Sequence, residues 1–133
     1  MTGALVTDTH PLIWWAGSRQ KLSARTRRAF QACTEGKLLI YVPAAVILEM
    51  ALLEEHRKIR LLTPFPAWVD SLFESPGFVP VATELVHVKE AWAMRRFADP
   101  FDRLIVAAAL QLGIPLISRD REIARSELVK MYW

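Results

Sequence analysis

One stretch, DPFDRLIVAAAL at residues 99–110, constrains the fold more than any other part of the chain. Asp99 is suited to cap a helix, because its carboxylate can accept from the first free backbone N–H groups, and Pro100 is suited to the first helical position. The residues at 104–110 are apolar on nearly every side, which predicts a buried helix. Gly113 ends this helix in the prediction, and residues 114–118 follow as a short buried strand.

Asp102 places a second carboxylate in the first turn of the same predicted helix. A negative charge there faces the positive end of the helix dipole, which is favourable. Asp99 already meets the capping need, so capping explains one carboxylate and leaves the other without a structural reason. Asp102 is therefore a candidate functional residue, whereas Asp99 is first of all a helix cap.

Short apolar segments alternate with helical ones along the chain. Strands are predicted at residues 4–7, 38–42, 78–81, 114–118 and 127–131, with a further extended piece at 58–62. Besides the helix at 100–112, helices are predicted after Pro11, after Ser23 as N-cap, from Pro43, at 67–74 and from Thr83 as cap to Phe97. This alternation predicts an α/β fold with a mainly parallel sheet.

Acidic residues adjoin several of these strands. Asp8 comes directly after the first strand, and Asp120 follows the strand at 114–118. Glu49 lies in the helix after the second strand, and its neighbours three and four residues away are all apolar, so we expect its carboxylate in a largely buried setting. Because ligands bind beyond the carboxyl ends of parallel strands, these acids, with Asp99 and Asp102, can converge at one edge of the sheet.

Several carboxylates at one place repel one another and cannot all stay ionised near neutral pH without a cation. Oxygen ligands without a histidine or cysteine cluster favour Mg²⁺ or Mn²⁺ over zinc. Such an ion, with a bound water and a phosphodiester, supports hydrolysis. The chain carries 17 Lys and Arg against 14 Asp and Glu, a net charge of +3, which is compatible with nucleic acid as the phosphodiester.

Composition also indicates the cellular compartment. Cys33 is the only cysteine, which excludes an internal disulfide and a cysteine-based metal site and fits a reducing compartment. The first residues lack the basic region of a signal peptide, and no apolar run approaches the roughly 20 residues that span a bilayer. We therefore expect a cytoplasmic protein with no membrane contact.

Four motifs then lead to a known family. LVTDTHPLIWW with KLS downstream, PAAVILEMALL, DPFDRLIVAAAL and PLISRDREI occur in order over nearly the whole chain. The chain resembles the PIN-domain ribonucleases, and in particular the VapC-like toxins of bacterial and archaeal type II toxin–antitoxin modules. Each motif is weak alone, but four in register are a strong signal. The resemblance implies that the acids holding the metal, and carrying the catalysis, are Asp8, Glu49, Asp102 and Asp120.

The resemblance implies more about the site and its setting. Asp99, Ser118 and Thr9 are auxiliary candidates beside the four acids. Residues 1–133 are expected to form a single PIN domain, a three-layer fold with a mainly parallel, about five-stranded sheet flanked by helices. The implied activity is that of a Mg²⁺- or Mn²⁺-dependent endoribonuclease. The implied partners are an RNA substrate, a small VapB- or Phd-like antitoxin and a second copy of the chain. Ala44 and Ala45 depart from the family, where a Ser or Thr often starts that helix.

Other interpretations stay open. Arg103 and Arg119 are candidates to contact RNA phosphate, but charge balance beside clustered carboxylates explains them equally well. The tryptophans fit core, dimer or antitoxin contacts better than base stacking. The alternatives to a toxin are a PIN-domain nuclease that processes RNA without an antitoxin, and a catalytically silent α/β protein-binding module.

Overall fold

The computed structural model describes residues 3–133, and its five parallel strands form one sheet in the order β3-β2-β1-β4-β5. The strands are β1 (Gly3–Thr7), β2 (Leu38–Pro43), β3 (Phe78–Val81), β4 (Leu116–Ile117) and β5 (Met131–Tyr132). The helices are α1 (Thr9–Gly17), α2 (Ala24–Thr34), α3 (Ala44–Glu55), α4 (Phe65–Glu74), α5 (Leu85–Ala93), α6 (Pro100–Leu112) and α7 (Arg121–Ser126), with a short 3₁₀ helix, η1 (Arg19–Lys21).

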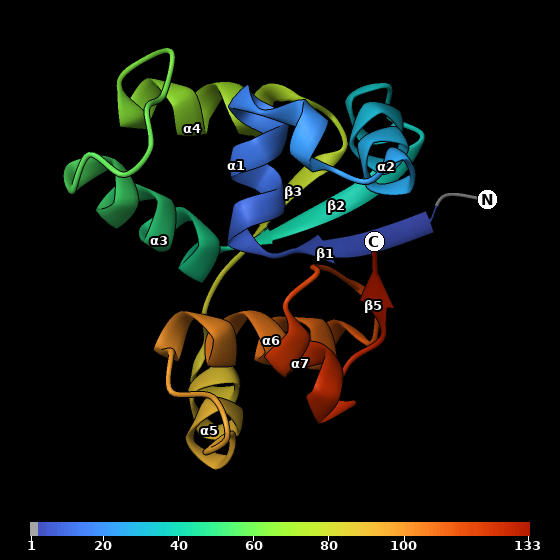
Figure 1. The fold of residues 1–133 in the computed structure, drawn as a ribbon, viewed down its shortest axis with the longest axis vertical. Helices are drawn as coiled ribbons and strands as arrows, with labels where there is room; N and C mark the ends of the chain where they lie inside the picture. The colour runs from blue at the N-terminus through green and yellow to red at the C-terminus, as the bar shows by residue number, and fades with distance from the viewer. Residues whose placement is uncertain (1–2) are drawn as a thin grey trace.

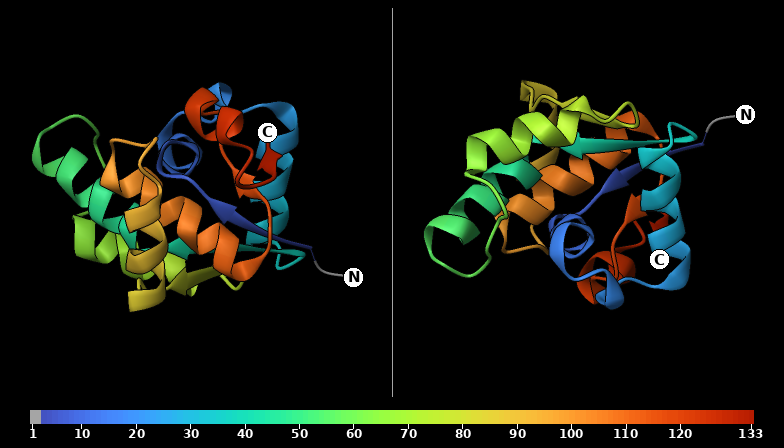
Figure 2. Two further views of the ribbon diagram at one scale, coloured as in Figure 1. Left: turned by 90° about the horizontal axis from the view of Figure 1, so that it is seen from below. Right: turned by 90° about the horizontal axis from the view of Figure 1, so that it is seen from above.

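The helices cover both faces of the sheet. Figure 1 shows α1, α2 and α4 above the strands, α3 beside their left-hand ends and α5 to α7 below them, and Figure 2 shows the molecule from below and from above. This arrangement follows from the chain order, because the first three strands step outward from β1 in one direction and β4 and β5 in the other. The predicted fold class, a three-layer α/β fold with a parallel sheet, is confirmed.

The strands and α6 supply most of the core. Val6, Ile40 and Leu116 are fully buried in three adjacent strands, as expected for a parallel sheet covered on both faces. On the α1–α4 side, Trp15 stacks on Phe30 with ring centroids 5.5 Å apart. Each such large apolar side chain contributes roughly 1.5–3 kcal/mol by leaving water, so these contacts fix the sheet that carries the site.

Helix α6 matches its prediction closely. The Asp99 side chain accepts from the backbone N–H of Phe101 at 2.7 Å, which caps the helix. Its centre, Ile105 to Ala109, is buried, and Gly113 ends it in the left-handed conformation at φ 67°. The first turn of α6, with Asp102, is therefore held firmly against the sheet.

Helix α5 differs from its prediction. It covers Leu85–Ala93 rather than running from Thr83 to Phe97, and its N-cap is Glu84. The backbone N–H of Glu84 donates to Nδ1 of His87 at 2.9 Å, which completes a reciprocal cap that sequence inspection overlooked.

Other local predictions are also wrong, beginning with α1, which starts at Thr9 instead of after Pro11. Residues 58–62 form bends and irregular backbone instead of an extended piece, β4 is shorter than 114–118, and α4 begins at Phe65 instead of Ala67. Residues 121–126 form α7, and the last strand lies at 131–132 instead of 127–131. Helix α7 has six residues and buries only Ile123, so it leaves no apolar period to detect.

Within residues 3–133, no helix combines the length and the apolar character needed to cross a membrane.

Candidate active site

Asp8 lies at the carboxyl end of β1, the central strand, with only 8% of its surface exposed. Its Oδ1 accepts from the backbone N–H of Thr9 at 2.8 Å, so the carboxylate also caps α1. Its Oδ2 accepts from the Ser118 hydroxyl at 2.7 Å. Burial raises the pKa of Asp8, and the two hydrogen bonds oppose this rise. Asp8 is thus a buried carboxylate held by fixed donors.

Ser118 connects two of the predicted site residues. While its hydroxyl donates to Asp8, the same oxygen accepts from the backbone N–H of Asp120 at 3.1 Å. The Asp120 side chain accepts from the backbone N–H of Ile123 at 3.0 Å and caps α7. The segment after β4 therefore brings Asp120 to the same edge as Asp8, as the sequence led us to expect.

Glu49 reaches this edge from α3. Its Oε1 accepts from the hydroxyl of Thr9, the residue after Asp8. Burial raises the pKa of Glu49 first, and the charges of Asp99 and Asp8 raise it further, while the bond from Thr9 opposes them. The carboxylate is half-buried rather than largely buried as predicted.

Asp102 has a strongly raised pKa. Burial in the first turn of α6 raises its pKa to about 7, and the charges of Asp8, Asp99, Asp120 and Glu49 add to the effect in that order. Within residues 3–133, no group donates a hydrogen bond to its side chain. All the predicted acids therefore act electrostatically on one carboxylate.

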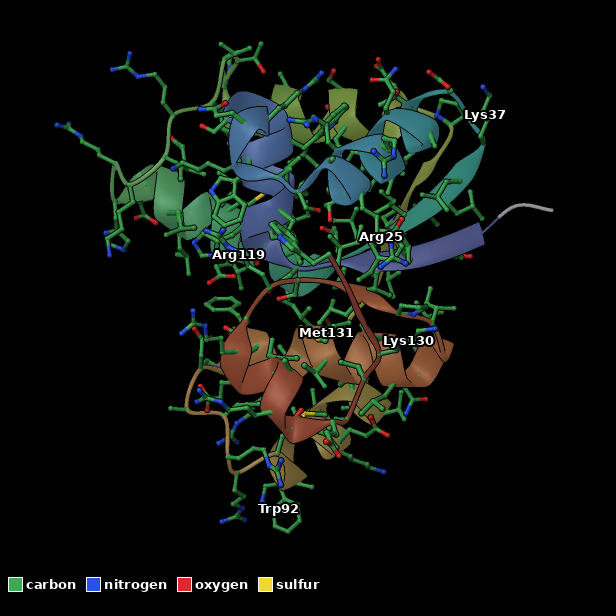
Figure 3. All side chains as sticks on the ribbon, turned by 45° about the vertical axis from the view of Figure 1, so that its right-hand side comes forward. Arg25, Lys37, Trp92, Arg119, Lys130 and Met131 are labelled. Carbon is green, nitrogen blue, oxygen red and sulfur yellow. The ribbon has the colours of Figure 1, made fainter. Side chains whose placement is uncertain are left out.

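The two arginine candidates are placed differently. Arg103 donates from Nε to the carbonyl of Phe97 at 2.6 Å and from Nη1 to that of Ala91 at 3.4 Å, so it braces the loop between α5 and α6. Arg119 is exposed, and its guanidinium carbon lies 4.5 Å from the ring centroid of Trp14 and 5.6 Å from that of Trp133. Figure 3 shows Arg119 where the layer of α1 and α3 meets that of α6 and α7.

A cleft of about 220 Å³ opens at this place. It is lined by side chains from the ends of β1 and β4 and from α1, namely Asp8, His10, Pro11, Trp14, Ser118, Arg119 and Asp120. Sequence reasoning did not place Trp14 or Trp133 beside the acids. Trp133 comes directly after the last strand, β5. Residues that follow parallel strands lie at the same edge of the sheet, so this position indicates that Trp133 lies near the acids.

The four acids offer only oxygen atoms as ligands, which suits Mg²⁺ or Mn²⁺, and His10 is the one imidazole in the lining of the cleft. In their present positions, no three acidic, histidine or cysteine side chains among residues 3–133 lie close enough to hold one ion. The carboxylates nevertheless raise one another's pKa, and none of the four acids forms an ion pair with a cationic side chain among the described residues. The chemistry of the four acids therefore suits a divalent cation, which would relieve this repulsion by drawing the carboxylates together.

Fold and site together define a class, an α/β domain with a cluster of carboxylates at the carboxyl edge of a parallel sheet. The chain belongs to the PIN domain family, whose sequence profile matches residues 5–127. This confirms the family expected from the four motifs.

Individual relatives agree with this assignment. Ribonuclease VapC22 of Mycobacterium tuberculosis is 31% identical over 123 residues, which cover 92% of this chain and 91% of the relative. The structure of VapBC2 from Rickettsia felis, bound to a DNA fragment from its promoter, has a TM-score of 0.70 at 10% identity and 97% coverage of both chains. A toxin–antitoxin complex from Klebsiella pneumoniae has a TM-score of 0.62 at 16% identity and 94% coverage of both. At these identities, the two structures show the shared fold.

Proposed function

We propose that this protein is a divalent-metal-dependent endoribonuclease and the toxin component of a type II toxin–antitoxin module. The observation that carries the proposal is the hydrogen-bonded acidic edge, in which Ser118 fixes Asp8 and Thr9 fixes Glu49. The name of the Mycobacterium tuberculosis relative, a ribonuclease, and the toxin–antitoxin complex with the same fold support the reaction and its setting.

In this proposal Asp8, Glu49, Asp102 and Asp120 hold the ion, and Asp99 assists from its capping position. When bound, Mg²⁺ or Mn²⁺ supplies an activated water and neutralises charge on the phosphodiester. Ser118 and Thr9 keep two of the carboxylates in a fixed orientation before the ion arrives. Burial and the neighbouring carboxylates raise the pKa of Asp102 to about 7, and a bound cation would favour its ionised form.

Arg119 is our candidate for the contact to RNA phosphate, because its guanidinium is exposed and adjoins the acidic cleft. Arg103 is half-buried and donates hydrogen bonds to two carbonyls, which supports a role in positioning the start of α6 rather than direct contact with RNA.

The proposal includes a cytoplasmic location, where RNA substrates are found. It also treats residues 1–133 as one PIN domain, because the sheet uses segments near both ends of the described chain.

The proposed partners are a small VapB- or Phd-like antitoxin and a second copy of the chain. Leu85, Val88 and Trp92 leave an apolar stripe on α5, exposed by 77%, 50% and 68%, and we assign this stripe to the homodimer. We expect Trp92→Glu to convert the dimer to a monomer in sedimentation velocity. Leu62→Glu, at an apolar residue 93% exposed outside α5, is the matched control and should leave the dimer intact.

The central test is cleavage of total cellular RNA by the purified protein with Mg²⁺, with Mn²⁺ and with EDTA, beside an Asp8→Asn variant. We expect discrete fragments that need the metal and disappear in the variant, because Asp8 is the most firmly held of the acids.

Three outcomes separate the alternatives. Equal cutting by both proteins would identify a contaminating nuclease and remove the evidence for catalysis. Absence of cutting together with Mn²⁺ binding in calorimetry would retain the metal site and reject total RNA as its substrate. Absence of both would favour a silent protein-binding module.

A further inference from the structure

A groove of about 510 Å³ lies between α1 and the segment at residues 58–61. Ile13 and Trp14 of α1, Leu53 of α3 and Lys21 of η1 contribute to its lining. A second hollow, of about 620 Å³, shares residues 58–61 with the groove. Neither hollow contains any of the four proposed metal ligands among its lining residues.

The end of α3 creates this groove. Arg57 takes the left-handed conformation at φ 58°, and the backbone N–H of Lys58 donates to the carbonyl of Leu53 at 2.8 Å. These features end the helix and turn the chain back, so that the basic sequence HRKIR at 56–60 leaves the helix axis. As a result, Lys58 and Arg60 line the groove instead of extending α3.

The charge of the groove has one sign. Its lining includes the cations Lys21, Lys58 and Arg60 and no carboxylate side chain. All three cations are exposed, and none forms an ion pair with a residue in the described part of the chain. In the neighbouring hollow, Arg57 adds a fourth cation and Glu54 is the one acid in the lining. The groove therefore favours a polyanion.

The groove continues into the acidic cleft. His10 and Trp14 line both cavities, and their rings lie 5.8 Å apart. Arg119, stacked over Trp14, borders the cleft at this junction. A strand with one phosphodiester at Asp8 would thus pass the two rings before it reaches the three cations.

We propose that this groove binds the single-stranded RNA that flanks the scissile bond on one side. Lys21, Lys58 and Arg60 contact successive phosphates, and Trp14 offers a ring for base stacking, which together are the elements of a binding track for single strands. This assignment rests on the proposed ribonuclease activity. Continuity with the acidic cleft and the absence of carboxylates from the lining favour RNA over a protein occupant.

The test measures RNA binding as a function of salt in an Asp8→Asn background, so that the probe is not cut. The probe is a short fluorescein-labelled oligouridylate, followed by anisotropy in Mg²⁺. The groove variant is Lys21→Gln/Lys58→Gln/Arg60→Gln. The control variant, Lys89→Gln/Arg125→Gln/Lys130→Gln, removes the same charge from exposed residues in the α5–α7 layer, where Figure 3 shows Lys130 on the layer below Arg119.

We expect the groove variant to bind at least about tenfold more weakly than the control at moderate salt. Its log–log salt slope should fall by about 2, since each phosphate contact on a single strand contributes about 0.7. In the parent sequence with Asp8 intact, kcat/KM should fall for a long RNA and stay unchanged for a dinucleotide, which is too short to reach the groove.

Equal losses in the groove and control variants would overturn the groove assignment and leave the proposed function standing, with a protein partner as the alternative occupant. A parent protein that neither binds nor cuts RNA would overturn the proposed function itself. Circular dichroism of both triple variants checks that exposed substitutions have left the fold intact.

Discussion

Asp8 and Asp102 face the same edge of the sheet but are held in opposite ways. Asp8 is buried at the end of β1, and each of its oxygens accepts a hydrogen bond, one from Thr9 and one from Ser118. Asp102 lies in the first turn of α6 without a donor of this kind among the described residues, and four other carboxylates act on it. The orientation of the Asp8 carboxylate is thus fixed before any ligand binds, whereas the Asp102 carboxylate is repelled by its neighbours.

The contrast indicates two separate contributions to the proposed metal centre. Fixed donors determine where an ion would sit, because they define the direction in which the Asp8 oxygens point. Accumulated charge determines how strongly a cation would be attracted, because Asp102 cannot ionise freely near pH 7 without one. Substitutions at the two residues should therefore have similar consequences for catalysis and different consequences for stability.

The largest expected effect is on cleavage. Asp8→Asn and Asp102→Asn should each lower kcat by at least about a thousandfold, as expected when one member of a cooperating catalytic set is removed.

In metal-free buffer at pH 8, Asp102→Asn should raise the free energy of unfolding by about 1–3 kcal/mol, because it removes an ionised group from a repulsive site. Asp8→Asn also removes a buried charge, but the amide cannot accept both hydrogen bonds, a loss of about 1 kcal/mol, so its gain in stability should be smaller than that of Asp102→Asn. Urea unfolding measures both, and equal changes in stability would contradict the comparison.

A smaller effect is expected from Ser118. Ser118→Ala removes the donor to Asp8 and the acceptor for the backbone N–H of Asp120, and should weaken Mn²⁺ binding by about 10–100-fold in calorimetry. Ser126→Ala is the matched control, since its hydroxyl also bonds locally but lies at the far end of α7. Unchanged Mn²⁺ affinity in Ser118→Ala would show that Asp8 does not depend on this donor for its orientation.

The smallest expected effect is a shift of melting temperature with pH. The folded-state pKa of Asp102 is raised from 3.8 to about 7, so the folded protein binds more protons than the unfolded chain between these values. Stability without metal should therefore fall as pH rises from about 4 to about 7. Asp8 and Glu49 are shifted in the same direction and add to the trend.

Added Mn²⁺ should reverse this trend and stabilise the protein more at pH 8 than at pH 5. Differential scanning fluorimetry follows both changes. A melting temperature that rises with pH in EDTA would contradict the assigned shift of Asp102.

Local signals account for the parts of the molecule that the sequence predicted well. Asp99, Pro100 and Gly113 mark the ends of α6, and all three act within a few residues of their own position. Strand β3 was predicted at its observed bounds, 78–81, because it is a compact apolar run. The family resemblance then related Asp8, Glu49, Asp102 and Asp120 to one site, which spacing alone only allowed.

The remaining features depend on contacts between distant residues. The Thr9–Glu49 bond joins residues 40 positions apart, and the Ser118–Asp8 bond joins residues 110 apart, so no local pattern predicts either. The turn at Arg57 was not predicted either, because a non-glycine residue at φ 58° gives no sequence signal. The residues that follow it have the pattern of a strand.

The position of Trp133 has a practical consequence for anyone who produces this protein. Trp133 follows β5, its ring lies 6.0 Å from that of Trp14, and the guanidinium carbon of Arg119 lies 5.6 Å from it. An affinity tag fused after Trp133 would emerge beside the cleft and compete with substrate for access. Strand β1 is parallel to β4 and β5 and begins at Gly3, at the end of the strands away from the cleft, so purification handles for activity assays belong at the N-terminal end.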